Sequence, residues 1–163
     1  MGARGFFVAQ EGHVVNILPP ANTAAGVSSQ AFNVKNAAHV SILLQFGALA
    51  EAPGAFTVNA GSDLAMAGAV AIPFNLFKQE TSGAANDVLS TRIAEAATGY
   101  APPDISDIFY VLEIDADTLP AGSPYLQLVL APAAVTTDTN LGSAIAILSG
   151  LRFAEDQGLT VTT

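Results

Sequence analysis

The chain has 163 residues, a formal net charge of −9, only 12% charged residues and no cysteine. Five scattered cations cannot form the basic stripe that neutralises phosphates, so nucleic-acid binding and attachment to an anionic membrane are excluded. The lack of cysteine excludes disulfides, thiolate metal sites and a cysteine nucleophile, and the length suffices for one domain with its own core.

Two short apolar runs lie near the N-terminus. Residues 6–9 and 14–18 are each predicted to form a strand, and Pro19-Pro20 is expected to end regular pairing. Residues 1–20 are therefore either an arm that leaves the domain or a first hairpin packed on the core, and residues 21–163 form the β-sandwich domain. The first apolar run is too short to be a secretory signal.

The next segments alternate between apolar and polar residues. In His39–Phe46, the side chains of Val40, Ile42, Leu44 and Phe46 share one face, which is typical of a half-buried strand. Residues 87–100 fit either a short helix capped by Asp87 or a strand at 90–94, and the surrounding strands favour the second. Further strands are predicted at residues 31–34, 56–59, 70–76 with an edge or bulge at Pro73, and 144–148.

Residues 107–132 contain two alternating apolar runs, with Ile108, Tyr110, Leu112 and Ile114 on one face of the first. Two prolines and a glycine separate the runs, so neither can continue through them as a helix. We expect two neighbouring antiparallel strands in the centre of the sheet.

The spacing of these segments predicts the fold class. About eight short strands, with turn residues every eight to twelve positions, are typical of an antiparallel sandwich or a jelly-roll-like barrel. No alternation of strands and helices competes with this pattern. We therefore expect a single all-β domain with a possible extended N-terminal arm.

Motifs that carry chemistry are absent from the sequence. There is no phosphate-binding loop, no G-x-S-x-G elbow and no HExxH, so we expect no enzyme, no catalytic residue and no cofactor. Of the two histidines, His13 is expected to face solvent in a turn. His39 begins an apolar strand and is expected to be a structural histidine with its hydrogen bonds satisfied.

Three carboxylates, Glu113, Asp115 and Asp117, share one face if the chain stays extended. Such a group could bind Ca²⁺ or supply the acid and nucleophile of a glycosidase. The favoured interpretation is a solvated strand end that enters a turn, because Asp is common in turns. We therefore predict no metal site, and cation binding by this group stays open.

Three segments together resemble capsid decoration, or cement, proteins of tailed bacteriophages. They are FNLFKQET (74–81), the stretch 107–132 and SAIAILSGLRF (143–153), and the similarity spans residues 58–153. The resemblance implies an all-β module on the outer surface of the virion capsid, commonly trimeric, with the major capsid protein as its partner. It implies a structural role in which binding stabilises the assembled shell.

An exposed apolar segment in a chain this poor in charge is expected to be buried on a partner. We accordingly predict that Arg4, Phe6, Phe7 and Val8 supply part of the capsid contact. One alternative is a structural protein of the phage neck or tail. Another is a carbohydrate-binding or calcium-dependent adhesion sandwich, which the content of three tyrosines and no tryptophan disfavours.

Overall fold

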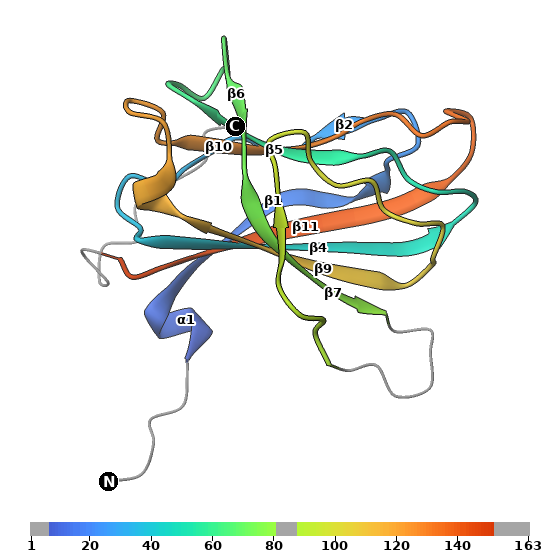
Figure 1. Cartoon of the computed structure of the whole chain (residues 1–163), viewed down its shortest axis with the longest axis horizontal. Coiled ribbons are helices and arrows are strands. Elements are labelled where there is room, and N and C mark those ends of the chain that lie inside the picture. The colour runs from blue at the N-terminus through green and yellow to red at the C-terminus, as the bar shows by residue number, and fades with distance from the viewer. Residues whose placement is uncertain (1–6, 81–87, 152–163) are drawn as a thin grey trace, which may run out of the picture.

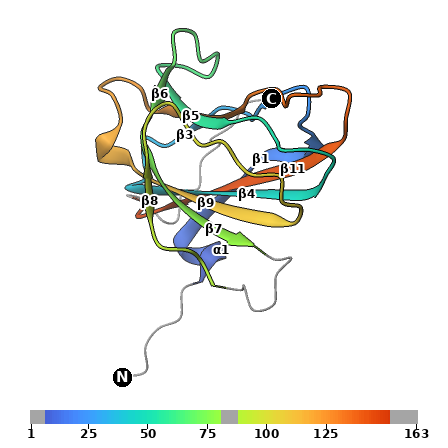
Figure 2. The same ribbon diagram turned by 45° about the vertical axis from the view of Figure 1, so that its right-hand side comes forward.

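Two antiparallel β-sheets make up the protein in a computed structural model that describes residues 7–80 and 88–151. The sheets lie one above the other, and their inner faces share one core (Figures 1 and 2). The six-stranded sheet contains, in spatial order, β1 (Gly12–Asn22), β11 (Asn140–Ser149), β4 (His39–Leu49), β9 (Ile108–Asp115), β7 (Phe74–Glu80) and β8 (Ile93–Glu95). The five-stranded sheet contains β2 (Val27–Ser28) and β3 (Phe32–Asn33), both paired with β10 (Tyr125–Leu130), then β5 (Phe56–Gly61) and β6 (Val70–Ile72).

Two short helical elements accompany the strands. The helix α1 (Val8–Glu11) precedes β1, and the 3-10 turn η1 (Ala116–Thr118) follows β9. The predicted all-β antiparallel sandwich is confirmed, although the described residues form eleven strands rather than about eight. The additional strands are short ones of two or three residues, such as β2, β6 and β8.

The pairing of the strands follows the pattern of a jelly roll. β1 pairs with β11, β2 and β3 pair with β10, β4 pairs with β9, and β5 pairs with β6. These strand pairs follow one another along one long hairpin. They lie alternately in the six-stranded and the five-stranded sheet. A hairpin wrapped in this way is the double-sheet architecture of jelly rolls. β7 and β8 are an addition inserted between β6 and β9 at one edge of the six-stranded sheet.

Alternate side chains of each long strand fill the core. On β4, the predicted inward residues Val40, Ile42, Leu44 and Phe46 are completely buried. Leu126, Leu128 and Leu130 of β10 do the same from the opposite sheet; each such side chain contributes about 1.5–3 kcal/mol by leaving water. The alternation that the sequence predicted therefore correctly separates the core from the outer faces.

An aromatic cluster joins the two sheets inside this core. The ring of Phe56 on β5 lies 5.4 Å from that of Tyr110 on β9 and 5.5 Å from that of Tyr100. Tyr110 also meets Phe46 of β4 edge-on at 6.2 Å. Edge-to-face pairs at these distances add to the free energy of burial.

The central stretch 107–132 differs from its prediction. Its two strands, β9 and β10, are not neighbours: β9 lies between β4 and β7, whereas β10 belongs to the other sheet. Alternation shows which side of a strand faces the core but not which strand lies beside it. The connection through η1 is longer than the usual hairpin loop and crosses from one layer to the other.

The N-terminal prediction also needs correction. The expected strand at residues 6–9 is wrong for its described part, because Val8–Glu11 is helical. Pairing does not end at Pro19-Pro20, since β1 continues to Asn22 beside β11. Irregularities in register around Leu18 and Ala21 accommodate the prolines, and β1 is an edge strand, where a missing N–H is tolerated.

Two further segments were predicted less accurately. The alternating run at 70–76 is divided at Pro73 into β6 and β7, which lie in different sheets. In the described part of the segment predicted as a short helix or strand, residues 88–100, the structure forms the strand β8, which begins at Ile93. Residues 81–87 and the predicted exposed tail after Leu151 lie outside the described residues.

Candidate protein-binding surface

The outward faces of the two sheets differ in chemistry. On the five-stranded sheet, the outward residues of β5 and β10 are mostly polar, namely Thr57, Asn59, Tyr125 and Gln127. An antiparallel sheet with one solvated face has this character. The six-stranded sheet instead carries apolar residues on both of its faces.

The register of the six-stranded sheet places the outward apolar side chains next to one another. Two adjacent cross-strand rows run across five strands, Val14–Ile147–Ser41–Glu113–Asn75 and Asn16–Ile145–Leu43–Val111–Phe77. We call the eight outward apolar residues of this sheet the outer apolar face: Val14, Leu43, Phe77, Phe109, Val111, Leu141, Ile145 and Ile147. Val14 is 48% exposed, Leu141 45% and Ile145 37%, whereas Val111 is 7% exposed and the other four are partly buried.

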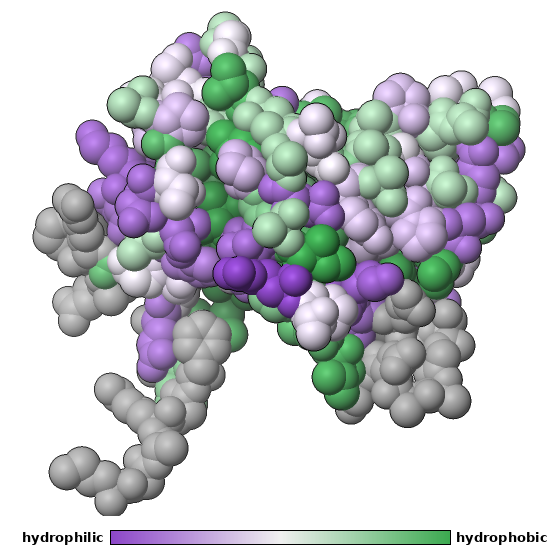
Figure 3. Space-filling view, viewed as in Figure 1, coloured by the Kyte–Doolittle hydropathy of each residue, from purple (hydrophilic) through white to green (hydrophobic). Residues whose placement is uncertain are grey.

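The helix α1 lies on the same side of the molecule as this face. In Figures 1 and 2 it projects below the six-stranded sheet, away from the five-stranded sheet. Phe7 and Val8 are 52% and 37% exposed. In the space-filling view, single hydrophobic residues lie at the lower border of the molecule among hydrophilic ones (Figure 3). Of the four predicted contact residues, Phe7 and Val8 are thus exposed beside the outer apolar face, and Arg4 and Phe6 lie outside the described residues.

One end of the outer apolar face is polar. His39 lies between two carboxylates of β9, with its Nδ1 2.7 Å from Oδ1 of Asp115 and its Nε2 bonded to Oε2 of Glu113. The hydroxyl of Ser41 donates to the same Glu113 oxygen at 2.8 Å. The pairing of β4 with β9 produces this cluster, because His39 lies opposite Asp115 and Ser41 opposite Glu113.

The arrangement favours a charged imidazole. Ionised carboxylates only accept hydrogen bonds, so both ring nitrogens of His39 must donate, which requires the doubly protonated form. Partial burial opposes that charge, but the hydrogen bonds and negative charges of Asp115 and Glu113 outweigh it and raise the pKa of His39 above 6.5. The resulting cation cancels part of the negative charge at this end of the face.

The same geometry does not form a catalytic triad or a metal site. The Ser41 hydroxyl is bonded to Glu113 rather than to His39, so the imidazole is not positioned to take its proton. Asp117, the third predicted carboxylate, lies in η1 beyond the end of the strand. In residues 7–80 and 88–151, no group of three or more His, Cys, Asp or Glu side chains is arranged to hold a metal ion. His13, which was expected in a turn, lies instead in the strand β1 opposite Leu148, because β1 already begins at Gly12.

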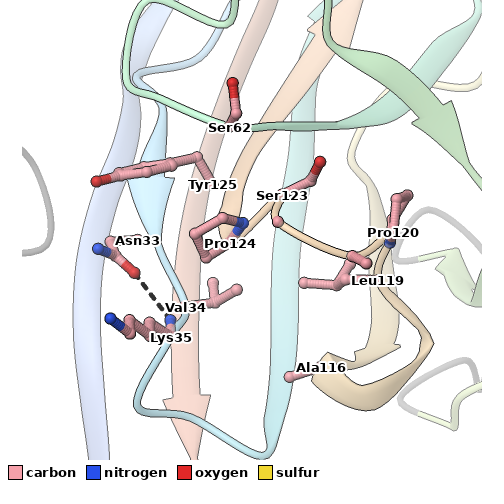
Figure 4. A pocket seen from close by; sticks show the side chains of 12 residues that line it. Asn33, Val34, Lys35, Ser62, Ala116, Leu119, Pro120, Ser123, Pro124 and Tyr125 are labelled. Carbon is pink, nitrogen blue, oxygen red and sulfur yellow. Dashed lines mark hydrogen bonds between the residues drawn. The ribbon is translucent and has the colours of Figure 1, made fainter.

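A hollow of about 650 Å³ lies between residues 33–35 and the turn that leads into β10 (Figure 4). Asn33 accepts a hydrogen bond from the backbone N–H of Lys35 at 2.8 Å on one side, and Tyr125 and Leu119 also line the hollow. Lys35 is the charged residue of its lining, and none of the described lining residues is a carboxylate or a histidine. The hollow therefore lacks the paired acid and base that hydrolysis requires.

Comparisons with known proteins show neither a family nor a function for this chain. No protein-family model matches the chain, and no curated protein is significantly similar to it. Two solved structures of infectious bursal disease virus, strains Gt and Gx, align with 9% identity and a TM-score of 0.14. The alignments cover 93% and 85% of this chain but only 45% and 40% of the viral chains, so this chain spans less than half of their length. Similarity at this level supports no argument about fold or function.

No helix within the described ranges is long and apolar enough to span a membrane.

Sequence reasoning missed the outer apolar face, although a signal for it was present. Ile108–Leu112 and Ala144–Leu148 are continuous apolar runs rather than strict alternations. Continuous runs of strand length indicate strands that are covered on both faces. Only the register of five strands shows that these runs lie side by side.

Proposed function

We propose that the protein is a structural component of a bacteriophage virion that binds the outer surface of the assembled capsid and stabilises it. The observation that carries this proposal is the exposed apolar surface that Phe7 and Val8 form on α1, at 52% and 37% exposure. Contiguous apolar surface on a folded chain marks a site of contact with another macromolecule. A chain with this surface and without a catalytic arrangement in its described part acts by binding.

Two further points support a virion protein in particular. Residues 58–153 resemble decoration proteins of tailed bacteriophages in sequence. The jelly-roll pairing is an architecture that viral capsid proteins use, as do lectins, so it adds support only by analogy.

The mechanism of stabilisation is binding linkage. A protein that binds the assembled shell better than its free subunits shifts the assembly equilibrium toward the shell, by RT ln(1 + [L]/Kd) for each site. The major capsid protein is the proposed partner, and attachment as an oligomer would multiply modest single contacts through effective concentration. Arg4, Phe6, Phe7 and Val8 are the proposed contact residues.

Co-sedimentation with intact and with dissociated shells of the encoding bacteriophage tests the proposal. We expect saturable binding to intact shells, at a copy number that follows the capsid lattice, and weaker binding to free subunits. Replacing both Phe7 and Val8 with Asp should weaken binding by at least about 30-fold, because two exposed apolar side chains lose their burial.

The matched control is Val70→Asp, which adds a carboxylate at a 50% exposed valine on β6 of the other sheet. This variant should bind shells as the wild type does. A copy number that corresponds to a single ring would indicate a neck or tail protein instead. Absence of wild-type binding to any particle would contradict the proposal.

A further inference from the structure

The outer apolar face is broad enough to be an interface in its own right. Its two rows cross β1, β11, β4, β9 and β7, with Leu43 of β4 in the centre. Strands lie about 4.8 Å apart and rise about 3.4 Å per residue, so five strands of about eight residues cover about 650 Å². Two such faces in contact would bury about 1,300 Å² in total, which lies within the range of stable interfaces.

The distribution of charge indicates which partner this face can accept. The chain carries a net charge of −9, so two copies repel each other over most approaches. Among the described outward residues of these five strands, the charged side chains are His39, Glu113 and Asp115. These three lie together at one end and are bonded to one another, which leaves the row Asn16–Ile145–Leu43–Val111–Phe77 uncharged.

The shape of the face also suits a second copy. Two antiparallel sheets pack face to face about 10 Å apart, with their strands offset by about 30°, when both have the usual twist. A second copy of the chain presents the same sheet, and therefore the same twist. A two-fold axis through the face would place Leu43 of one copy near Leu43 of the other, so that apolar residues around Leu43 meet the same residues of the second copy.

We infer that the outer apolar face binds a second copy of this chain, forming a symmetric face-to-face dimer. The interface centres on Leu43, Ile145 and Ile147, and it leaves Phe7 and Val8 of α1 for the contact with the shell. This inference concerns the isolated protein and does not depend on the proposed function. A face-to-face pair is a dimer, in contrast to the trimer that the resemblance implies.

Sedimentation equilibrium of the full chain tests the pairing. The wild type should have the mass of a dimer at micromolar concentrations. Ile145→Asp should be a monomer at concentrations at which the wild type is a dimer. We expect its dissociation constant to rise at least about 100-fold, because each copy brings a carboxylate into an apolar contact. Val70→Asp is the matched control on the other sheet and should pair as the wild type does.

A second test uses the absence of cysteine from the chain. A single Leu43→Cys variant should form a disulfide-linked dimer under mild oxidation, whereas a Val70→Cys variant should not. A wild type that stays monomeric would overturn the inference, as would an Ile145→Asp variant that still pairs. Equal cross-linking of the two cysteine variants would reject this face as the interface even if the protein is dimeric. Shell binding, measured separately, tests the proposed function alone.

Discussion

At the scale of single residues, His39 shows how pairing between strands creates an electrostatic feature. Neither Glu113 nor Asp115 is near His39 in sequence, and the β4–β9 register brings all three together. The sequence predicted that His39 is structural and that the acidic residues end a strand. It could not predict that they would bond to each other, because alternation does not specify the neighbouring strand.

The raised pKa of His39 predicts a pH dependence of stability. A group whose pKa is higher in the folded state contributes stability that is fully present below its unfolded pKa of about 6.5 and is lost as the pH rises through the folded value. The contribution should be below about 1 kcal/mol, because the cluster is partly exposed and screened by solvent.

Urea unfolding of the wild type and of His39→Gln, from pH 5.5 to 9, measures this contribution. We expect the wild type to lose stability relative to the variant as the pH rises above 6.5. Parallel stability curves for the two proteins over this range would contradict the assignment.

At the scale of elements, one buried side chain fixes the beginning of β11. Asn140 is completely buried, and its Oδ1 accepts hydrogen bonds from the backbone N–H groups of Ala50 at 3.0 Å and Glu51 at 3.4 Å. Its own N–H donates to Asn22 Oδ1 at 2.9 Å, and its carbonyl accepts from Thr23. Asn140 thus holds together the ends of β1, β4 and β11.

We expect Asn140→Ala to lower the free energy of unfolding by about 1–3 kcal/mol, because the N–H groups of Ala50 and Glu51 lose their acceptor. The control is Asn16→Ala, which removes an exposed amide from β1 and should change stability by less than about 0.5 kcal/mol. Urea unfolding at one pH measures both variants. Equal effects would show that Asn140 does not hold these ends together.

The positions of the strands were predicted more accurately than the pairing between them. The alternation of apolar and polar residues identified the inward side chains of β4, β5, β9 and β10. Packing against the core produces this alternation in each strand separately. The partners of β9 and β10 were wrong, because pairing depends on how the whole chain wraps. The outer apolar face was missed for the same reason, because its residues come from five strands and the sequence does not show which strands are neighbours.

At the scale of the whole molecule, the aromatic cluster around Phe56 connects the layers. Its ring contacts Tyr100 and Tyr110, and it lies 6.2 Å from the ring of Phe74 on the opposite sheet. Phe56→Ala should therefore reduce the free energy of unfolding by about 3–5 kcal/mol, through lost burial and an internal cavity.

The same substitution at Phe7, which is 52% exposed, is the matched control and should cost less than about 1 kcal/mol. Denaturant midpoints at a constant m-value provide the comparison. A loss at Phe56 no larger than the loss at Phe7 would show that the cluster does not join the sheets.

The position of β11 has a consequence for how the protein reaches this structure. β11 is the last described strand along the chain, yet it lies between β1, the first, and β4. During synthesis on the ribosome, β1 and β4 therefore stay without this neighbour until β11 has emerged. Such long-range pairing makes folding slow, and the waiting strand edges are open to pairing with other nascent chains. We expect the protein to complete its fold only after β11 has emerged, and its solubility during expression to depend on how quickly β11 enters the sheet.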